Sequence, residues 1–438
     1  NQGQSLAADG ILHFLLGKEK ELIISGGGGV GKTYLMRHVI NKLVQEVQQI
    51  LDATGGPKLF DSIEVCATTN KAADVLCTST NYPTTTIHNL LGLTVATNFK
   101  TGETSLARKK GALPVENKLI IIDECSMIDR NLYHEINALT INCKIIYVGD
   151  HCQLAPVKET LSPIYNQRLP FYNLTEPMRN AEQPALMALC QQFRDTVEMI
   201  SQNGGNDPMA FKPIQEVPGV IDHVGPAEMQ NLIDSTFATQ NDDARILAYT
   251  NRRVNEYNQY VRVMRNLPPE FTVGEHLVIN NALMLPNITL PVESEVELLS
   301  LGAPKDTHIA EFQGEDVYMS IQRAEILHKT YGEISLNIPA NFTHYRDLKD
   351  WFRKEKSWRN YYNLHQGYPD LRPRDASTVH KAQGSTYGIT FVDLTDISTC
   401  TSDDQVARML YVALSRSRNR VVLFGELKPR HGGAVIKA

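Results

Sequence analysis

The fold of this chain is decided by the stretch Glu21-Leu-Ile-Ile-Ser-Gly-Gly-Gly-Gly-Val-Gly-Lys-Thr-Tyr-Leu-Met-Arg-His-Val-Ile-Asn-Lys-Leu43. Its apolar start predicts a strand, its glycines predict a loop over residues 26–33, and residues 34–43 predict a helix. Glycines allow backbone N–H groups to turn toward a phosphate, and a helix N-terminus adds partial positive charge. The pattern G-x-x-x-x-G-K-T in this strand–loop–helix setting predicts a nucleoside triphosphate site rather than an ordinary flexible turn.

Two side chains of the loop suit the chemistry of a triphosphate. Lys32 can reach the β- and γ-phosphates, and Thr33 can offer its hydroxyl to Mg²⁺. Gln4 lies in a predicted amphipathic helix that precedes the loop strand. A glutamine amide can bond both the donor and the acceptor of an adenine edge, but a plain surface glutamine is an equally open interpretation.

Carboxylates for the same site follow a second apolar run. Residues 119–122 predict a buried strand that ends in Asp123 and Glu124. One carboxylate at a strand end can hold Mg²⁺, and the next can orient and deprotonate the attacking water. A further buried strand over residues 144–149 leads to Gln153. This glutamine is either a sensor beside the γ-phosphate or an ordinary turn residue.

Composition limits the classes of function. The 438 residues, 42% of them hydrophobic, suffice for two or three domains with their own cores. A net charge of −6, from 43 basic and 49 acidic residues, argues against a generic polycation and an anionic-membrane binder, but a basic groove for nucleic acid stays open. Seven cysteines without a C-x-x-C pair predict reduced, intracellular thiols. We expect neither a membrane span nor a signal peptide.

The chain divides into three predicted domains of an α/β protein. Residues 1–175 hold the glycine loop, residues 176–266 and 376–438 form a second α/β unit without such a loop, and residues 267–375 form an insertion. β-prone segments between proline and glycine turns, followed by a basic aromatic stretch at residues 351–362, predict a β-rich insertion with a helical excursion. Packing and base stacking are both open for these aromatics.

Two further segments carry polar residues that suit a ligand. Thr68-Thr69-Asn70-Lys71 follows a predicted strand at residues 63–67, where parallel sheets bind ligands, although the same residues suit a helix N-cap. Thr101-Gly102 predicts a β-hairpin within residues 93–117, and the basic run 108–110 lies in it. A binding role and a merely solvated hairpin are both open.

The ordered series of these motifs resembles the superfamily 1 helicases. Three of them, Thr86-Ile-His88, His380-Lys-Ala-Gln-Gly384 and Tyr411-Val-Ala-Leu-Ser-Arg416, resemble the B subgroup with its RecD-like and Dda-like members. The other motifs that carry the resemblance are Gly26–Thr33, Thr68–Ala73, Asp123-Glu-Cys-Ser126, Gly149-Asp-His-Cys-Gln-Leu154, Arg179 and Thr378–Gly384. The resemblance covers nearly the whole chain and is weakest at residues 195–240 and 267–375.

The resemblance implies a fold and a set of sites. The fold is two RecA-like parallel-sheet P-loop NTPase domains with an inserted β-hairpin and a small inserted β-barrel-like domain. The implied catalytic residues are Lys32, Glu124, the γ-phosphate sensor Gln153, and the arginine fingers Arg179 and Arg416. The implied nucleotide-binding residues are Gln4, Gly29, Val30, Gly31, Lys32, Thr33, Tyr34 and Gly384, with Thr33 and Asp123 as Mg²⁺ ligands. The implied DNA-binding residues are Thr69, Asn70, Lys71, His88, Phe99, Asn251, Thr378, His380 and Lys381.

The implied function is ATP- and Mg²⁺-dependent movement along single-stranded DNA, 5′ to 3′, with strand separation at single-strand/duplex junctions. The hairpin would be the separating pin and Phe99 its wedge. The implied setting is phage-type DNA replication or recombination in bacterial cytoplasm, with a single-strand-binding protein or replisome components as partners. The alternatives are a protein-displacing translocase with little unwinding, a small-molecule P-loop NTPase, and a passive nucleic-acid-binding module.

Two positions depart from the family pattern. The loop carries four consecutive glycines, Gly26 to Gly29, where an alanine and a threonine are usual, which predicts a looser backbone. Cys125 replaces the commoner valine or alanine after the paired carboxylates, and we expect it to be a packing residue.

Overall fold

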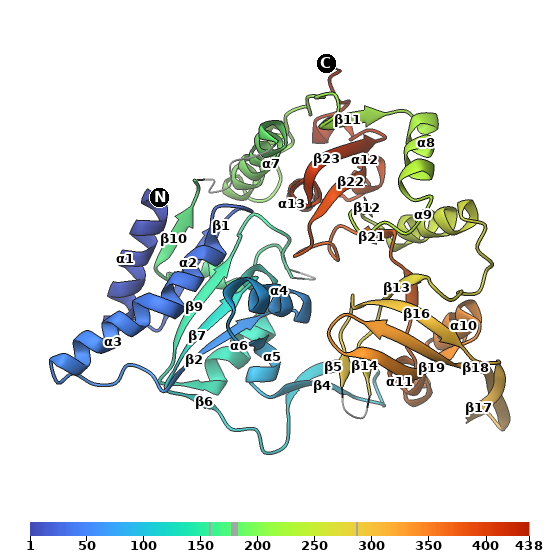
Figure 1. The fold of residues 1–438 in the computed structure, drawn as a ribbon, viewed down its shortest axis with the longest axis horizontal. Helices are drawn as coiled ribbons and strands as arrows, with labels where there is room; N and C mark the ends of the chain where they lie inside the picture. Colours follow the sequence, from blue (N-terminus) through green and yellow to red (C-terminus); the bar gives the residue numbers. More distant parts are fainter. Residues whose placement is uncertain (157–158, 177–182, 286–287, 438) are drawn as a thin grey trace.

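The structure, a computed structural model, describes residues 1–156, 159–176, 183–285 and 288–437. Among these residues, two large parallel sheets and one large antiparallel sheet lie in three separate regions of the molecule, beside three two-stranded ribbons (Figure 1). The two parallel sheets confirm the predicted α/β class. Within these residues, no helix is long and apolar enough to cross a membrane.

The first parallel sheet belongs to the glycine-loop unit. Its strand order is β10 (Phe171–Leu174), β1 (Glu21–Gly26), β9 (Lys144–Gly149), β7 (Lys118–Asp123), β2 (Ser62–Ala67) and β3 (Thr84–Thr86). Apolar side chains cover both faces, as the near-continuous apolar runs of the central strands require. The helices around this sheet are α1 (Gln2–Leu16), α2 (Lys32–His38), α3 (Val44–Ala53), α4 (Asn70–Thr80), α5 (Ile87–Leu90) and α6 (Arg130–Leu139).

The second parallel sheet has the order β11 (Ile221–Val224), β23 (Ser417–Phe424), β22 (Tyr387–Asp393), β12 (Ala244–Ala248) and β21 (Ala376–Thr378). Its helices are α7 (Pro184–Gln202), α8 (Pro226–Thr236), α9 (Asn251–Met264), α12 (Leu394–Ile397) and α13 (Asp403–Ser415). Helix α7 runs without a break to Gln202. Leu186, Leu189, Phe193, Val197 and Ile200 are all buried along it at helical spacing.

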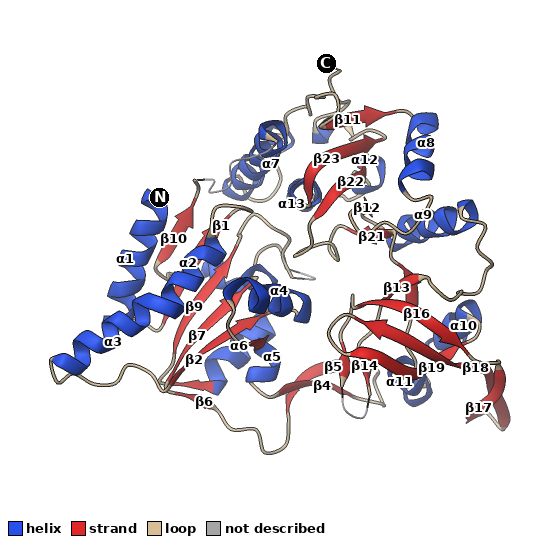
Figure 2. Ribbon diagram, viewed as in Figure 1, coloured by secondary structure: helices blue, strands red, loops and turns tan. Residues whose placement is uncertain are grey.

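The insertion between α9 and β21 is an antiparallel sheet covered by two helices (Figure 2). Its strands are β13 (His276–Ile279), β16 (Glu295–Leu301), β17 (Lys305–Phe312), β18 (Glu315–His328), β19 (Gly332–Pro339) and β20 (Leu371–Pro373), beside the small ribbon β14 (Leu283–Met284)–β15 (Thr289–Leu290). Among the described residues the strand pairings form an open path with β19 as a branch, so the barrel-like form is not confirmed.

The aromatics of the helical excursion mostly serve packing. They lie on α10 (Phe342–Lys354) and α11 (Trp358–Gly367). Phe352 and Tyr362 are buried, whereas Trp351 is 38% exposed at the rim of the same cluster. Packing of these aromatic side chains therefore explains their helical spacing, for which the sequence had left base stacking as an alternative.

The predicted hairpin is formed by β4 (Leu93–Thr97) and β5 (Thr104–Arg108), which pair antiparallel. It leaves the first unit and reaches the insertion, as Figure 1 shows. β6 (Val115–Glu116) follows and pairs with β8 (Thr140–Ile141). The three sheets agree with the predicted domains, whose boundaries at residues 175/176, 266/267 and 375/376 stay a prediction.

Candidate functional site

The glycine loop joins β1, the second strand of the first sheet, to α2, and three of its residues require glycine. Gly29 and Gly31 have φ angles of +79° and +86°, the left-handed region that costs other residues strain. Gly26 is fixed by space, because a Cβ there would lie 2.7 Å from the carbonyl oxygen of Leu174. Among the hydrogen bonds of the described residues, none uses an amide of residues 27–31 as donor. These amides remain available to an anion at the start of a helix.

The lysine of the loop lies over the amide cradle. Lys32 Nζ donates to the carbonyl oxygens of Gly26 and Gly27 at 2.7 and 2.9 Å. Thr33 follows at the first turn of α2, and Tyr34 is 66% exposed beside it. The loop therefore brings its one cation to the position that a bound phosphate would occupy.

Gln4 lies at the other side of the loop. Its Nε2 donates to the carbonyl oxygen of Gly31 at 3.3 Å, and its Oε1 accepts from the amino group of Asn1 in the capping box of α1. The side chain is buried. This places Gln4 next to the nucleotide loop, and its adenine contact stays a prediction.

Asp123 and Glu124 lie at the carboxyl end of β7 and are partly accessible. Burial, with the neighbouring Glu124 carboxylate, raises the pKa of Asp123 to about 7 against the opposing effect of Lys32. The Asp123 carboxylate in this position favours a neighbouring cation. Together with the hydroxyl of Thr33, it provides oxygen ligands of the kind that suit Mg²⁺. These residues fit the Mg²⁺ that the resemblance implies.

Glu124 has an unusual backbone. Its φ of +52° is left-handed, a conformation that strains a residue other than glycine and that often marks a functional position. The hydroxyl of Thr68 donates to its carbonyl oxygen at 3.2 Å and holds the turn. Cys125, the next residue, is fully buried against Gly149, and burial raises its pKa to about 12, so it is a packing residue as expected.

Gln153 lies where the two parallel-sheet units meet. It is 6% exposed, and its Oε1 accepts from Nε2 of Gln383 at 3.4 Å. Gln383 precedes Gly384, whose φ of +74° forms the turn after β21. The structure thus brings together two motifs that are far apart in the sequence, and the sensor role of Gln153 stays a prediction.

Of the two predicted arginine fingers, only Arg416 lies among the described residues. Arg179 lies outside the described residues. Arg416 is 8% exposed, and its guanidinium donates to the carbonyl oxygens of Val412 and Ser385 at 3.1 and 3.2 Å and to the hydroxyl of Ser415 at 2.9 Å. In this structure Arg416 is therefore folded onto its own unit, and its finger role stays a prediction that requires it to leave these partners.

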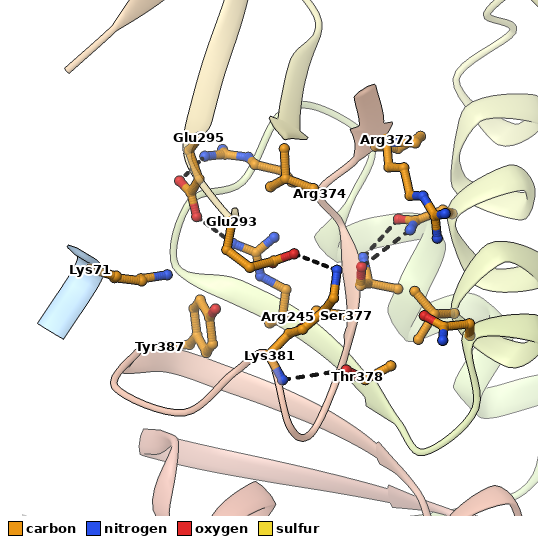
Figure 3. A pocket seen from close by; sticks show the side chains of 16 residues that line it. Lys71, Arg245, Glu293, Glu295, Arg372, Arg374, Ser377, Thr378, Lys381 and Tyr387 are labelled. Atoms are coloured by element: carbon orange, nitrogen blue, oxygen red, sulfur yellow. Dashed lines mark hydrogen bonds and ion pairs between the residues drawn. The ribbon is translucent and has the colours of Figure 1, made fainter. Parts of the chain in front are cut away.

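Four of the predicted DNA-binding residues line one pocket: Lys71, Asn251, Thr378 and Lys381 (Figure 3). Glu293, from the insertion, pairs with Lys381 at 2.6 Å, and Glu295 pairs with Arg245 at 3.1 Å and with Arg374 at 2.9 Å. The pocket thus combines cations of the second unit, carboxylates of the insertion and Lys71 of the first unit. Lys381 would have to exchange a carboxylate for a phosphate to grip DNA.

Apart from the predicted wedge, the other residues of the predicted strand path lie at the start of α4, on α5 and in the turn after β21, outside the lining of this pocket. Thr69 and Asn70 are exposed at the start of α4, where the hydroxyl of Thr69 caps the helix by accepting from Ala72 N at 3.2 Å. Helix capping is thus one role of Thr69. His88 lies on α5, and burial lowers the pKa of His88 and of His380.

Phe99, the predicted wedge, is 51% exposed at the tip of the hairpin. Its ring meets that of Tyr362 edge-on at 6.1 Å, and the Tyr362 hydroxyl donates to the carbonyl oxygen of Gly102 at 2.9 Å. The hairpin tip is therefore held by α11 of the insertion, which supports a fixed wedge rather than a solvated hairpin.

Sequence reasoning missed Arg194 altogether and gave Tyr411 no role of its own. Arg194 Nη1 lies 2.6 Å from the buried Asp150 Oδ1, and the Tyr411 hydroxyl donates to Asp150 Oδ2 at 2.6 Å. The available signal was the apolar period of α7, which continues past residue 193 and would have placed Arg194 in a helix rather than after its end.

Two parallel-sheet units, of which one carries a triphosphate loop and both contribute side chains beside it, define a two-domain P-loop NTPase. Residues 14–159 match the AAA domain family, and residues 375–424 match the UvrD-like helicase C-terminal domain. The chain is 24% identical to the ATP-dependent DNA helicase dda of Enterobacteria phage T4 over 459 aligned positions, covering 95% of this chain and 97% of that protein.

A second relative matches a shorter part. The RecBCD enzyme subunit RecD of Buchnera aphidicola subsp. Schizaphis graminum is 31% identical over 158 positions, or 32% of this chain and 23% of that protein. Among solved structures, Pif1 helicase from Bacteroides with ADP-AlF3 and ssDNA is similar, with a TM-score of 0.46, 14% identity, and coverage of 98% and 94%. These matches support a similarity of this chain to superfamily 1B helicases of the Dda-like group, which extends over nearly its whole length.

Proposed function

We propose that the protein is an ATP-dependent DNA helicase, which translocates on single-stranded DNA and separates duplex DNA. The observation that carries this function is the contact of the triphosphate-loop unit with the second unit beside the loop. Gln153 meets Gln383, and a side chain at Gly27 would meet Tyr411 and Arg194. Nucleotide binding at the loop is therefore linked to the position of the second unit.

The chemical roles follow from the geometry of the loop. The amides of residues 27–31 and Lys32 would bind the phosphates, and Thr33 and Asp123 would hold Mg²⁺, which would supply positive charge beside the phosphates. Glu124, fixed by its left-handed backbone, orients the attacking water and takes its proton.

The mechanical roles belong to the pocket and the hairpin. ATP contacted by both units favours a closed arrangement, and loss of the γ-phosphate releases it. Alternating grips on the DNA backbone by Lys71 in the first unit and Lys381 in the second would then move the strand without regard to sequence. The hairpin with Phe99 would separate the strands, and 5′-to-3′ polarity and replisome partners remain expectations from the resemblance.

The first experiment measures ATP turnover with and without oligo-dT, at low and at moderate salt. We expect strong stimulation that weakens as salt rises, because binding of the phosphate backbone releases counterions. Brisk basal turnover without stimulation would overturn the proposal in favour of a small-molecule NTPase. It would also remove the DNA roles of the second unit.

A second experiment separates a helicase from a translocase with little unwinding. Phe99→Ala and Tyr362→Phe should each slow unwinding of a forked duplex while ATP turnover with oligo-dT stays near that of the wild type, since both changes lie at the hairpin and not at the ATP site. Tyr318→Phe, an exposed change on β18, is the control. Unwinding that is unaffected by both changes would contradict the pin assignment.

A further inference from the structure

A segment of the first unit is buried in the second unit. The chain leaves β9 at Gly149 and continues through residues 150–154. Cys152 and Leu154 are fully buried in the apolar cluster of α7 and α13, with Phe193 and Leu410. Residues 150–154 are thus attached to the first sheet by the backbone and by His151, whose Nδ1 lies 2.7 Å from Ser25 Oγ, whereas Cys152 and Leu154 are buried in the second unit.

Asp150 is the polar anchor of this segment. It is completely buried, and its two carboxylate oxygens are taken by different helices: Oδ1 by Arg194 of α7 and Oδ2 by Tyr411 of α13, both at 2.6 Å. Burial raises the pKa of Asp150 and the Arg194 guanidinium lowers it, with a net lowering. Asp150 is thus an ionised partner of both helices.

Arg408 provides a second anchor. It is 2% exposed, and its Nη1 donates to the carbonyl oxygens of His151 and Gln153 at 2.5 and 2.8 Å, while Asp404 holds its Nε at 2.8 Å. Arg408 and Tyr411 are three residues apart and share one face of α13. This face therefore fixes both the start of the segment and Gln153.

The same groups touch the triphosphate loop. A Cβ at Gly27 would lie 3.1 Å from the Tyr411 hydroxyl and 3.3 Å from Arg194 Nη1. Lys32 donates to the carbonyl oxygen of Gly27 on the loop. A triphosphate that draws Lys32 away would therefore release the carbonyl oxygen of the residue that faces Tyr411 and Arg194.

We propose that Arg194 is a positioning residue, which with Asp150 and Tyr411 transmits the nucleotide state of the loop at Gly27 to α7 and α13. The inference rests on the proposed function and adds to it the contact through which the second unit responds. Arg194 acts through Asp150 and the loop backbone, and it is distinct from the two predicted arginine fingers. One helix that carries the relay, α13, ends beside Arg416, so a shift of the helix also shifts the finger.

The test measures the affinity for oligo-dT without nucleotide and with the β,γ-imido analogue of ATP, in the wild type and in variants of the full chain. In Tyr411→Phe and Arg194→Gln, we expect the nucleotide-dependent change in affinity to fall at least fivefold. We also expect kcat with oligo-dT to drop while the KM for ATP changes less than twofold. Arg194→Lys keeps a positive charge beside Asp150, so it should recover part of the nucleotide-dependent change in affinity for oligo-dT.

Tyr318→Phe and Arg353→Gln, two exposed positions on β18 and α10, are the matched controls and should behave as the wild type. If Arg194→Gln fails to fold, the milder Arg194→Lys and Tyr411→Phe decide. If the folded Tyr411→Phe and Arg194 variants keep the full nucleotide-dependent change in affinity for oligo-dT, the role of Arg194, Asp150 and Tyr411 in transmitting the nucleotide state is overturned. The proposed function would stay intact. A wild type whose oligo-dT affinity ignores nucleotide would instead overturn the proposed function and the relay together.

Discussion

The two α/β units have parallel sheets, but they use the carboxyl ends of their strands in opposite ways. After β1 in the first unit, no described hydrogen bond uses the amides of residues 27–31. After β12 in the second unit, Asp396 accepts from the amides of Tyr249 and Thr250, both at 2.7 Å, and from the Thr250 hydroxyl at 2.8 Å. A carboxylate of the protein occupies the helix N-terminus that would otherwise attract an anion.

This difference explains how two similar sheets can have different tasks. A parallel sheet offers ligand-binding groups at the carboxyl ends of its strands, but it binds phosphate only where its donors are left to a ligand. The first unit leaves them and adds Lys32. In the second unit, Asp396 accepts hydrogen bonds from the corresponding donors and stabilises the start of α9. This unit therefore responds to the nucleotide that is bound by the first unit.

The largest effect should come from removing the cation of the loop. Lys32→Ala should reduce ATP turnover roughly 10²- to 10³-fold, because a preorganised charge at the phosphates is lost. Binding to oligo-dT should be retained. Lys42→Ala, an exposed position in the same helical run, is the control for turnover. Normal turnover in Lys32→Ala would remove the phosphate site from the first unit and end the comparison.

Glu124→Gln should have the next largest effect. The amide cannot take a proton from water, so turnover should fall roughly 10²-fold while ATP still binds. Steady-state turnover and equilibrium binding of ATP measure the two properties separately. Glu116→Gln, on the exposed side of β6, is the control. If ATP binding is lost together with turnover, Glu124 holds the nucleotide and not the water.

Asp396→Asn tests the other half of the comparison. It leaves buried amide and hydroxyl donors with a weaker and imperfect acceptor, and it should destabilise the protein by about 1–3 kcal/mol in urea unfolding. Asp350→Asn, in an exposed ion pair, should cost at most about 1 kcal/mol. Equilibrium dialysis should still find one ATP per chain. Two ATP molecules per Asp396→Asn chain would show that the second unit is a masked nucleotide site.

The smallest effect distinguishes two neighbouring glycines of the loop. A Cβ at Gly28 would meet nothing within 4 Å, whereas Gly29 has a φ of +79°. Gly28→Ala should raise stability by about 0.4–1 kcal/mol through the unfolded chain, and Gly29→Ala should lower it by about 1–2 kcal/mol. Thermal melting of the two variants measures both. A stable Gly29→Ala would mean that the loop has no fixed left-handed turn.

Much of the site could be predicted because its parts are short segments of sequence. The glycine loop, the carboxylates after β7 and the hairpin turn at Gly102 each depend on a few consecutive residues. The insertion was harder, since β-prone segments do not say which strands pair. The sequence predicted a barrel-like insertion, and the pairings of the described strands give an open antiparallel sheet.

The sequence by itself determined the triphosphate loop and the strands that carry it, because glycine conformation and apolar periodicity are local properties of the chain. Only the tertiary structure decided the partners of the charged side chains. Arg194 and Tyr411 meet at Asp150 from positions 44 and 261 residues away, and Tyr362 meets the hairpin across 260 residues. Such pairs depend on how separate elements pack, and no local pattern encodes that packing.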